Sequence, residues 1–200
     1  MKKLSGFLMI AVVIAMSFAL SACNSVTKID DFKEKLETAE SLEFSVSIEA
    51  LGVMVYSHTM KFDGNKAYYA GSETEPYYTE LKDDGYLYTY TKTADGWESD
   101  YGKYVPETSE DADPLAGYAF EELFNGKNYE YSREYKVYMA RSDANISFAG
   151  TELSKIELTL KDGNCNISAS ATVEGVPAKI EMVFKNIGST VVTIPETTIG

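Results

Sequence analysis

The chain has 200 residues, with 18 basic and 31 acidic side chains and a net charge of −13 at neutral pH. This acidic balance argues against a nucleic-acid partner and against electrostatic adhesion to anionic lipid headgroups. With one histidine and two cysteines, the chain also has few residues for a zinc site or for a catalytic set built on histidine.

The first 22 residues have the three-part pattern of a secretory signal. Lys2 and Lys3 give a basic start, residues 4–20 form an uncharged apolar stretch, and small residues follow. The stretch "LSAC", residues 20–23, resembles the bacterial lipobox, which implies cleavage before Cys23 and a diacylglyceryl group on its sulfur. Two acyl chains hold a protein stably at a membrane, so we expect a protein anchored to the cell membrane on its extracytoplasmic face. The alternative is an uncleaved membrane helix in which Cys23 is incidental.

Removal of residues 1–22 leaves 178 residues, enough for one domain. It also removes two lysines and no acid, so 16 basic residues remain against 31 acidic ones and the net charge becomes about −15. We expect the lipidated cysteine and a short tether over residues 23–28, followed by a single domain over residues 29–200. With Cys23 lipidated, Cys165 has no disulfide partner, and we interpret it as a small buried residue of a strand.

A helix is predicted over about residues 27–40, because Ile29, Phe32 and Leu36 recur at helical spacing. The chain that follows alternates between apolar and polar residues, as strands do, and Asp-Gly or Asn turns separate the runs. These runs predict strands at residues 42–50, 53–62, 66–70, 77–81, 86–91 and 97–101. They form a meander of antiparallel hairpins.

A second helix is predicted from Asp113 and Pro114 to Gly126, with Leu123 and Phe124 on its apolar side. Residues 129–140 are ambiguous between helix and strand, and we favour a strand in their later part. Further strands are predicted at residues 151–161, 166–175 and 178–187, with a last short one at 189–196. The predicted fold class is α+β, mainly antiparallel β, in which the sheet curls and the two helices cover its concave side.

Several segments together resemble the LolA-like superfamily of lipoproteins and lipoprotein carriers. They are the signal and lipobox, the N-terminal helix, the first strand "SLEFSVSIEA", the tyrosine-rich hairpins and the ending "AKIEMVFKNIGSTVVTIPE". The similarity covers most of residues 26–196 and includes no catalytic motif. It implies a half-open β-barrel with helices in its mouth and, as in characterised members, a cavity for acyl chains. The carrier of that family is soluble, whereas this chain has an anchor of its own, which puts shuttling between membranes in doubt.

No pattern in the sequence indicates an enzyme, and we expect no cofactor and no metal. His58 lies in a predicted strand, where we interpret it as a packed or half-exposed residue. The stretch "DGNCN", residues 162–166, begins like a calcium loop but lacks the glycine at the sixth position and the acid at the twelfth. We therefore interpret it as a turn.

Two binding functions remain open. In the first, the domain binds a lipid or another apolar ligand between its concave face and the helices. That cavity would be lined by Phe44, Val46, Val55, Leu87, Leu123, Phe124, Ile156 and Leu158. A cavity able to hold an acyl chain would favour this hypothesis, and a filled core would favour the second.

In the second hypothesis the domain is an anchored interaction or sensor module that binds a protein or an envelope polymer. Its binding face would be made by Tyr86, Tyr88, Tyr90 and Trp97. Alternate residues of a strand share one face, and tyrosine rings offer apolar surface with a polar tip. The alternative is that these rings only stabilise a solvated sheet, because tyrosine is a good strand former.

Overall fold

The computed structural model describes residues 27–104 and 120–197. The predicted signal, Cys23 and the start of the second predicted helix at Asp113 lie outside these residues. The described chain is mostly strand, and its elements follow one another in this order: β1 (Ser41–Ala50), β2 (Val53–Asp63), β3 (Lys66–Gly71), β4 (Tyr77–Leu81), β5 (Tyr86–Thr93), β6 (Gly96–Lys103), α2 (Phe120–Leu123), the 3₁₀ turn η2 (Gly126–Asn128), β7 (Tyr129–Ser132), β8 (Val137–Ala140), β9 (Ile146–Phe148), β10 (Thr151–Lys161), β11 (Asn164–Val173) and β12 (Val176–Lys185).

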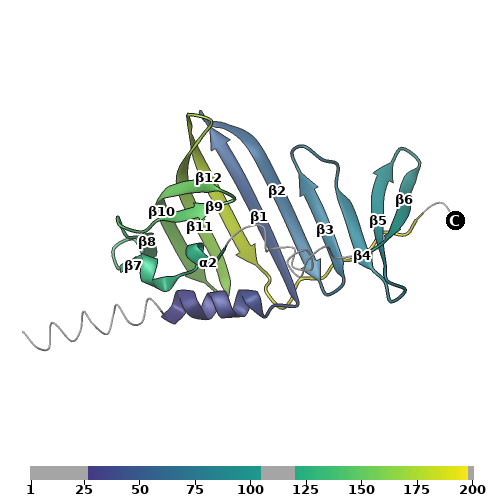
Figure 1. The fold of residues 1–200 in the computed structure, drawn as a ribbon, viewed down its shortest axis with the longest axis horizontal. Helices are drawn as coiled ribbons and strands as arrows, with labels where there is room; N and C mark the ends of the chain where they lie inside the picture. Colours follow the sequence, from purple (N-terminus) through teal and green to yellow (C-terminus); the bar gives the residue numbers. More distant parts are fainter. Residues whose placement is uncertain (1–26, 105–119, 198–200) are drawn as a thin grey trace, which may run out of the picture.

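All described strands belong to one antiparallel sheet, in the order β6-β5-β4-β3-β2-β1-β12-β11-β10-β8-β7, with β9 beside β10 (Figure 1). Strand β1 lies between β2 and β12, so that Phe44 faces Met60 on one side and Phe184 on the other. The first and the last strand of the sheet therefore pair with each other in its middle. Within the described residues the sheet does not close, because β6 and β7 each pair on one side only.

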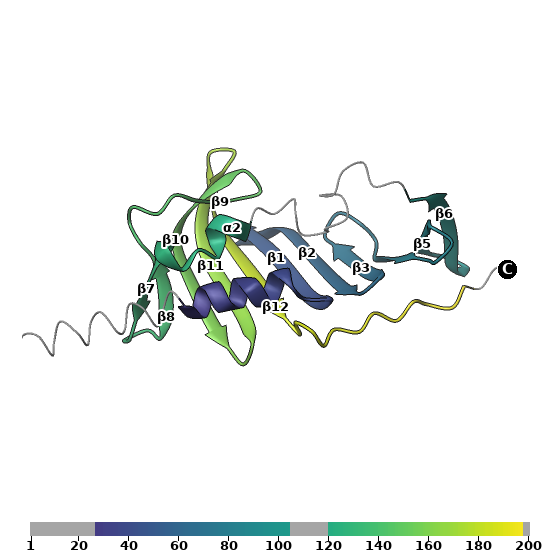
Figure 2. The ribbon, with the colours of Figure 1, turned by 60° about the horizontal axis from the view of Figure 1, so that its bottom comes forward.

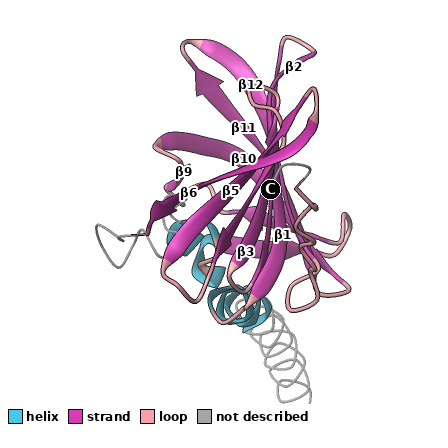
Figure 3. Ribbon diagram, turned by 90° about the vertical axis from the view of Figure 1, so that its right-hand side faces the viewer, coloured by secondary structure: helices cyan, strands magenta, loops and turns pink. Residues whose placement is uncertain are grey.

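The helices lie on the same face of the sheet, which we call the inner face (Figure 2). The N-terminal helix, described over residues 27–37, buries Ile29, Phe32 and Leu36 against it. The backbone N–H of Gly126, at the start of η2, donates a hydrogen bond of 2.9 Å to the carboxylate of Asp30, which ties the two helical segments together. Seen from the β6 end, the strands fan out with the twist of the sheet and the helices remain on one side (Figure 3).

Phenylalanine rings fill the space between the helices and the sheet. The ring of Phe184 lies 4.7 Å from that of Phe44, 5.1 Å from Phe120 and 5.2 Å from Phe124. Phe32 of the N-terminal helix lies 5.2 Å from Phe124 and 6.3 Å from Phe184. The fold is thus an open, mainly antiparallel α+β sheet with helices on one face, as the sequence predicted at this level of detail.

Three predictions of secondary structure were wrong in part. The first helix ends at Glu37 rather than near Glu40, and the N–H of Ala39 bonds the carbonyl of Leu36, three residues back, instead of continuing the α-helical pattern. Residues 129–140 form a hairpin, β7 and β8, so the strand predicted in the later part is confirmed and the earlier part is a strand as well. The short strand β9 was not predicted.

Residues 189–196 are not a strand, although their residues alternate. The preceding strand, β12, and its partner β1 each pair with a strand on both sides. Neither has an open edge with which residues 189–196 could pair. The segment instead crosses the outer face, and the N–H of Val192 donates to the carboxylate of Asp63 at 3.1 Å. It continues towards β5 and β6 (Figure 2).

Candidate functional site

Six of the eight residues predicted to line an apolar cavity come together in the core. Their exposed fractions are 3% or less, and they are Phe44, Val46, Leu123, Phe124, Ile156 and Leu158. They contact one another and the phenylalanine cluster. None of the six lines any of the three hollows, of about 710, 600 and 520 Å³, found among the described residues. The described core at this place is packed with side chains.

The other two predicted lining residues, Val55 and Leu87, do not lie with these six. Val55 is 53% exposed, and its neighbours Val53 and Met54 are exposed as well. It is the extra residue of a bulge, because Ile48 faces Tyr56 and Glu49 faces Met54. Alternation from the buried Met60 also places Val55 on the face opposite to that of Phe44. Leu87 is half-buried on β5, three strands beyond β2, and faces Leu81 of β4.

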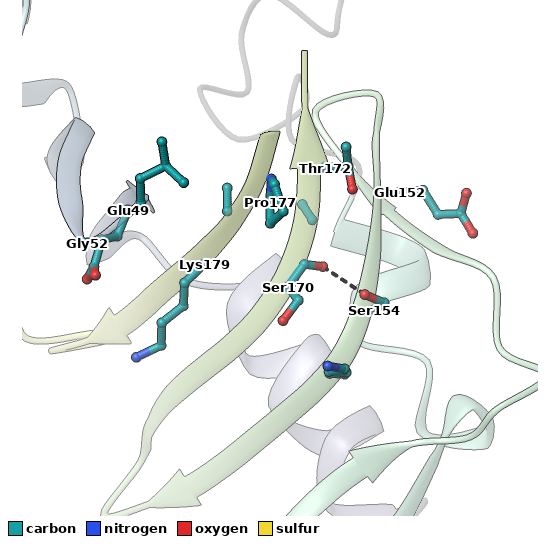
Figure 4. Close-up of a pocket in the computed structure, with 12 residues that line it drawn as sticks. Glu49, Gly52, Glu152, Ser154, Ser170, Thr172, Pro177 and Lys179 are labelled. Carbon is teal, nitrogen blue, oxygen red and sulfur yellow. Dashed lines mark hydrogen bonds between the residues drawn. The ribbon is translucent and has the colours of Figure 1, made fainter. Parts of the chain in front are cut away.

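The hollow of about 710 Å³ lies on the outer face of the sheet, across β1, β12, β11 and β10 (Figure 4). Its lining is mostly polar, and the hydroxyl of Ser154 donates to the carbonyl of Ser170 at 3.2 Å. The side-chain nitrogen of Lys179 forms an ion pair with the carboxylate of Glu181 at 2.6 Å. Ligand pockets are usually apolar with a few converging polar groups, and this shallow polar surface has no such centre.

Strand register places a large aromatic surface on the outer face of β3–β6. Lys61 of the outer face lies opposite Tyr68, Tyr68 lies opposite Tyr78, and Tyr78 lies opposite Tyr90. Since paired residues share a face, each strand adds rings to the same side. We call this set the tyrosine face; its members are Tyr68, Tyr78, Tyr86, Tyr88, Tyr90, Trp97 and Tyr101.

The rings of the tyrosine face form two connected groups. Tyr78 lies 4.9 Å from Tyr68 and 5.3 Å from Trp97, between ring centroids. Tyr101 lies 5.4 Å from Tyr88 and 5.6 Å from Tyr86. Lys61 and Lys82 add cations above the rings of Tyr68 and Tyr88, at 5.8 and 3.8 Å. The surface is held in place by ring contacts rather than by a covering layer of helix.

The four residues predicted for the interaction face all belong to this surface, but they differ in exposure. Tyr86 is 37% exposed, whereas Tyr88 and Trp97 are half-buried. Tyr90 is only 6% exposed, so its ring supports the surface and does not offer contact area, which corrects the prediction for this residue. It lies in mid-strand between Tyr78 and Ser99 of the flanking strands. The prediction missed three members, Tyr68, Tyr78 and Tyr101, and of these Tyr101 is the most exposed, at 63%.

Hydrogen bonds fix two hydroxyl groups of the tyrosine face. The hydroxyl of Tyr90 donates to Glu80 at 3.1 Å, and that of Tyr88 donates to Asp84 at 3.2 Å. Burial, followed by the bond to the Glu80 carboxylate, raises the pKa of Tyr90 to about 12. Tyr90 therefore stays neutral over the physiological range.

A second aromatic row lies on the inner face of β2, β3 and β4. It consists of Tyr56, His58, Tyr69 and Tyr77, with Tyr69 and Tyr77 stacked at 4.8 Å. His58 is half-buried beside Tyr56, as predicted, and burial lowers its pKa. Neighbouring tyrosines such as Tyr68 and Tyr69 must point to opposite faces, and this sequence signal indicates that the tyrosine-rich hairpins form two aromatic surfaces.

The remaining candidate residues have structural positions. Cys165 is fully buried between β10 and β12, where burial raises the pKa of its thiol, so the prediction of a small buried residue is confirmed. Asp162 and Gly163, with φ of 53° and 77°, make the predicted turn. In residues 27–104 and 120–197, no three His, Cys, Asp or Glu side chains are grouped as a metal site. None of the helices described there is long and apolar enough to span a bilayer.

No protein-family model matches the chain, and no curated protein matches it either. The inference of function therefore depends on the sequence signals and on the geometry of the described residues.

Proposed function

We propose that this protein is a lipid-anchored, non-catalytic binding module on the extracytoplasmic side of a bacterial cell membrane, and that it binds its partner through the tyrosine face. The observation that carries the proposal is the register of β3–β6, which places seven aromatic rings on one face of the sheet, opposite to the helices. Tyrosine and tryptophan are enriched at binding surfaces, because they supply large contact area at a small cost in side-chain entropy.

The anchor is supported by the lipobox before Cys23 and by the position of the first helix. Only three residues, 24–26, separate Cys23 from Thr27, which is already helical. Lipidation at Cys23 would therefore keep the domain close to the bilayer. The open sheet with helices on its inner face also agrees with the half-barrel of LolA-like proteins, and we propose that the chain has this fold.

Apolar-ligand binding between helices and sheet is the less favoured function, because the described residues there fill the space with their own side chains. Native mass spectrometry of the lipoprotein purified in mild detergent distinguishes apolar-ligand binding from binding through the tyrosine face. An additional mass of a lipid that is not the covalent anchor would favour the cavity, and its absence would favour the tyrosine face.

The anchor is tested by expressing the full chain in a bacterium and measuring its intact mass in the membrane fraction. We expect loss of residues 1–22 and gain of a diacylglyceryl group, because the thiol of Cys23 is the acceptor. The Cys23→Ala variant should stay unprocessed and unlipidated. Recovery of a wild-type chain with residues 1–22 still attached would favour an uncleaved membrane helix instead.

The tyrosine face is tested by the binding of the lipoprotein to cell-envelope fragments of the producing bacterium. The double variant Tyr86→Thr/Tyr101→Thr removes two exposed rings and keeps good strand formers, so binding should fall at least tenfold. Tyr135→Thr is the matched control, because Tyr135 is 66% exposed but lies in the turn between β7 and β8. Equal loss in both variants would contradict the proposal.

A further inference from the structure

Charged residues are divided unequally between the two faces of β3–β6. By register, the outer face carries Lys66, Lys92 and Lys103 and a single acid, Glu80. The inner face of the same strands carries Glu98 and Asp100 and no basic residue. In a chain with a net charge of −13, the tyrosine face is thus a locally basic surface.

Two acids near the tyrosine face, Glu80 and Asp84, are engaged within the protein. Glu80 accepts the hydroxyl of Tyr90 and lies 3.9 Å from Lys82. Asp84 accepts the hydroxyl of Tyr88 and the N–H of Tyr86. Lys92 and Lys103, in contrast, are exposed and make no ion pair within the described part of the chain. Among the strand residues of the tyrosine face, the charges that remain available to a ligand are therefore positive.

The uncharged part of this face consists almost entirely of aromatic rings. Its strand positions hold no aliphatic side chain larger than that of Ala70. Neighbouring ring centroids lie 4.9 to 5.6 Å apart, close to the spacing of adjacent strands, about 4.8 Å. One unit of an extended sugar chain has a similar length, and the C–H face of a sugar ring packs well on an aromatic ring.

The surface is also extended rather than hollow. None of the residues of β3–β6 lines any of the three hollows found among the described residues. A small molecule would bury little of its area on such a face, whereas a polymer can cross several strands.

We propose that the tyrosine face binds an acidic polysaccharide that crosses the strands. Sugar rings stack on Tyr86, Tyr101 and their neighbours, and the anionic groups pair with Lys92 and Lys103. This inference rests on the proposed function, because it names the chemistry of the partner for the same face.

The test uses the full lipidated chain in nanodiscs of zwitterionic phospholipid, with binding followed by the fluorescence of Trp97, the single tryptophan. Four probes are compared: polygalacturonate, neutral dextran, poly-L-glutamate, and phosphatidylglycerol vesicles. We expect polygalacturonate to bind at least tenfold more tightly than each of the others, with an affinity that falls as salt rises.

Two double variants separate the contribution of the tyrosine rings to binding from that of the lysines, and a third double variant is the control. Tyr86→Thr/Tyr101→Thr should weaken polygalacturonate binding at least tenfold at all salt concentrations. Lys92→Gln/Lys103→Gln should weaken it several-fold and flatten its salt dependence. Tyr135→Thr/Lys161→Gln, which removes an exposed tyrosine and an exposed lysine elsewhere, should leave it unchanged. Thermal unfolding of each variant excludes misfolding as the cause.

The failures of the two proposals are distinguishable. Equal or tighter binding of poly-L-glutamate or of the vesicles, lost in the tyrosine variant, would overturn the polysaccharide and leave the tyrosine face as a binding surface. If none of the four probes binds, but the tyrosine variant still weakens binding to envelope fragments, the polysaccharide is overturned and the tyrosine face remains a binding surface. Binding of polygalacturonate that neither double variant changes would overturn the tyrosine face as well.

Discussion

The two halves of the sheet use aromatic residues in different ways. In the half covered by the helices, β1 and β10–β12 contribute phenylalanine, leucine, isoleucine and methionine to one continuous core. In the other half, β3–β6 have tyrosine on both faces and no described helix above them. All seven phenylalanines of the described residues belong to or pack against the core cluster, whereas the tyrosine face contains none.

The two halves differ in the chemistry of their aromatic side chains rather than in their hydrophobic content. A phenylalanine ring stabilises the fold most where all its sides are buried, but a tyrosine ring can pack by one face and still keep its hydroxyl in water or on a carboxylate. A sheet that lacks a covering layer can therefore be built from tyrosine, and it then presents contact area to a partner. The helix-covered half should determine stability, and the β3–β6 half should determine binding.

Truncation of the central core ring should have the largest effect on stability. Phe184→Ala removes a fully buried ring that contacts Phe32, Phe44, Phe120 and Phe124, so the free energy of unfolding should fall by about 3 to 5 kcal/mol. Urea unfolding followed by far-UV circular dichroism measures it, and Trp97 fluorescence shows whether β6 unfolds in the same transition. A loss below about 1 kcal/mol would mean that this half is not the stabilising one.

An intermediate effect is expected at Tyr90, the buried ring under the tyrosine face. Tyr90→Phe removes the hydrogen bond to Glu80 and should lower the free energy of unfolding by about 1 kcal/mol at pH 8. Because the pKa of Tyr90 is about 12 when folded and about 10 when unfolded, this hydroxyl contributes its full stability below pH 10 and loses it between pH 10 and 12.

The difference between wild type and Tyr90→Phe should therefore shrink as pH rises from 10 to 12. Urea unfolding of both proteins at several pH values measures this, and the other tyrosines cancel because both proteins contain them. A difference that stays constant to pH 12 would show that the Glu80 bond does not hold the Tyr90 proton.

The smallest effect on stability is expected at the exposed edge of the tyrosine face. Tyr101→Thr removes a ring that is 63% exposed from a strand with one partner, so the free energy of unfolding should change by less than about 1 kcal/mol. The same variant should still weaken binding to envelope fragments. A large destabilisation with unchanged binding would reverse the roles assigned to the two halves.

Much of the strand pattern could be predicted because alternation and Asp-Gly turns are local signals. The strands from β1 to β6 and from β10 to β12 lie close to their predicted ranges for this reason. The alternation of residues 189–196 is also strand-like, but their pairing depends on whether an edge is open. That information lies in residues far away in the sequence, such as Asp63, which binds the N–H of Val192.

The candidate site shows the same division between local and distant information. The shared face of Tyr86, Tyr88 and Tyr90 follows from alternation within one strand, and the structure confirms it. The addition of Tyr68 and Tyr78 needs the register between strands, and the burial of Tyr90 needs its flanking neighbours. Val55 was misplaced because the inner face of β2 is set by its register with β1, in which Met60, His58 and Tyr56 face Phe44, Val46 and Ile48.

The central position of β1 has a consequence for how the chain is made. One of its two partner strands, β12, is made long after β1, because Phe44 pairs with Phe184 across most of the described residues. The core therefore cannot close until β12 has been made, and such long-range pairing is slow. If the chain is exported, as we propose, we expect this slow pairing to favour its passage in an unfolded state, with the core closing afterwards.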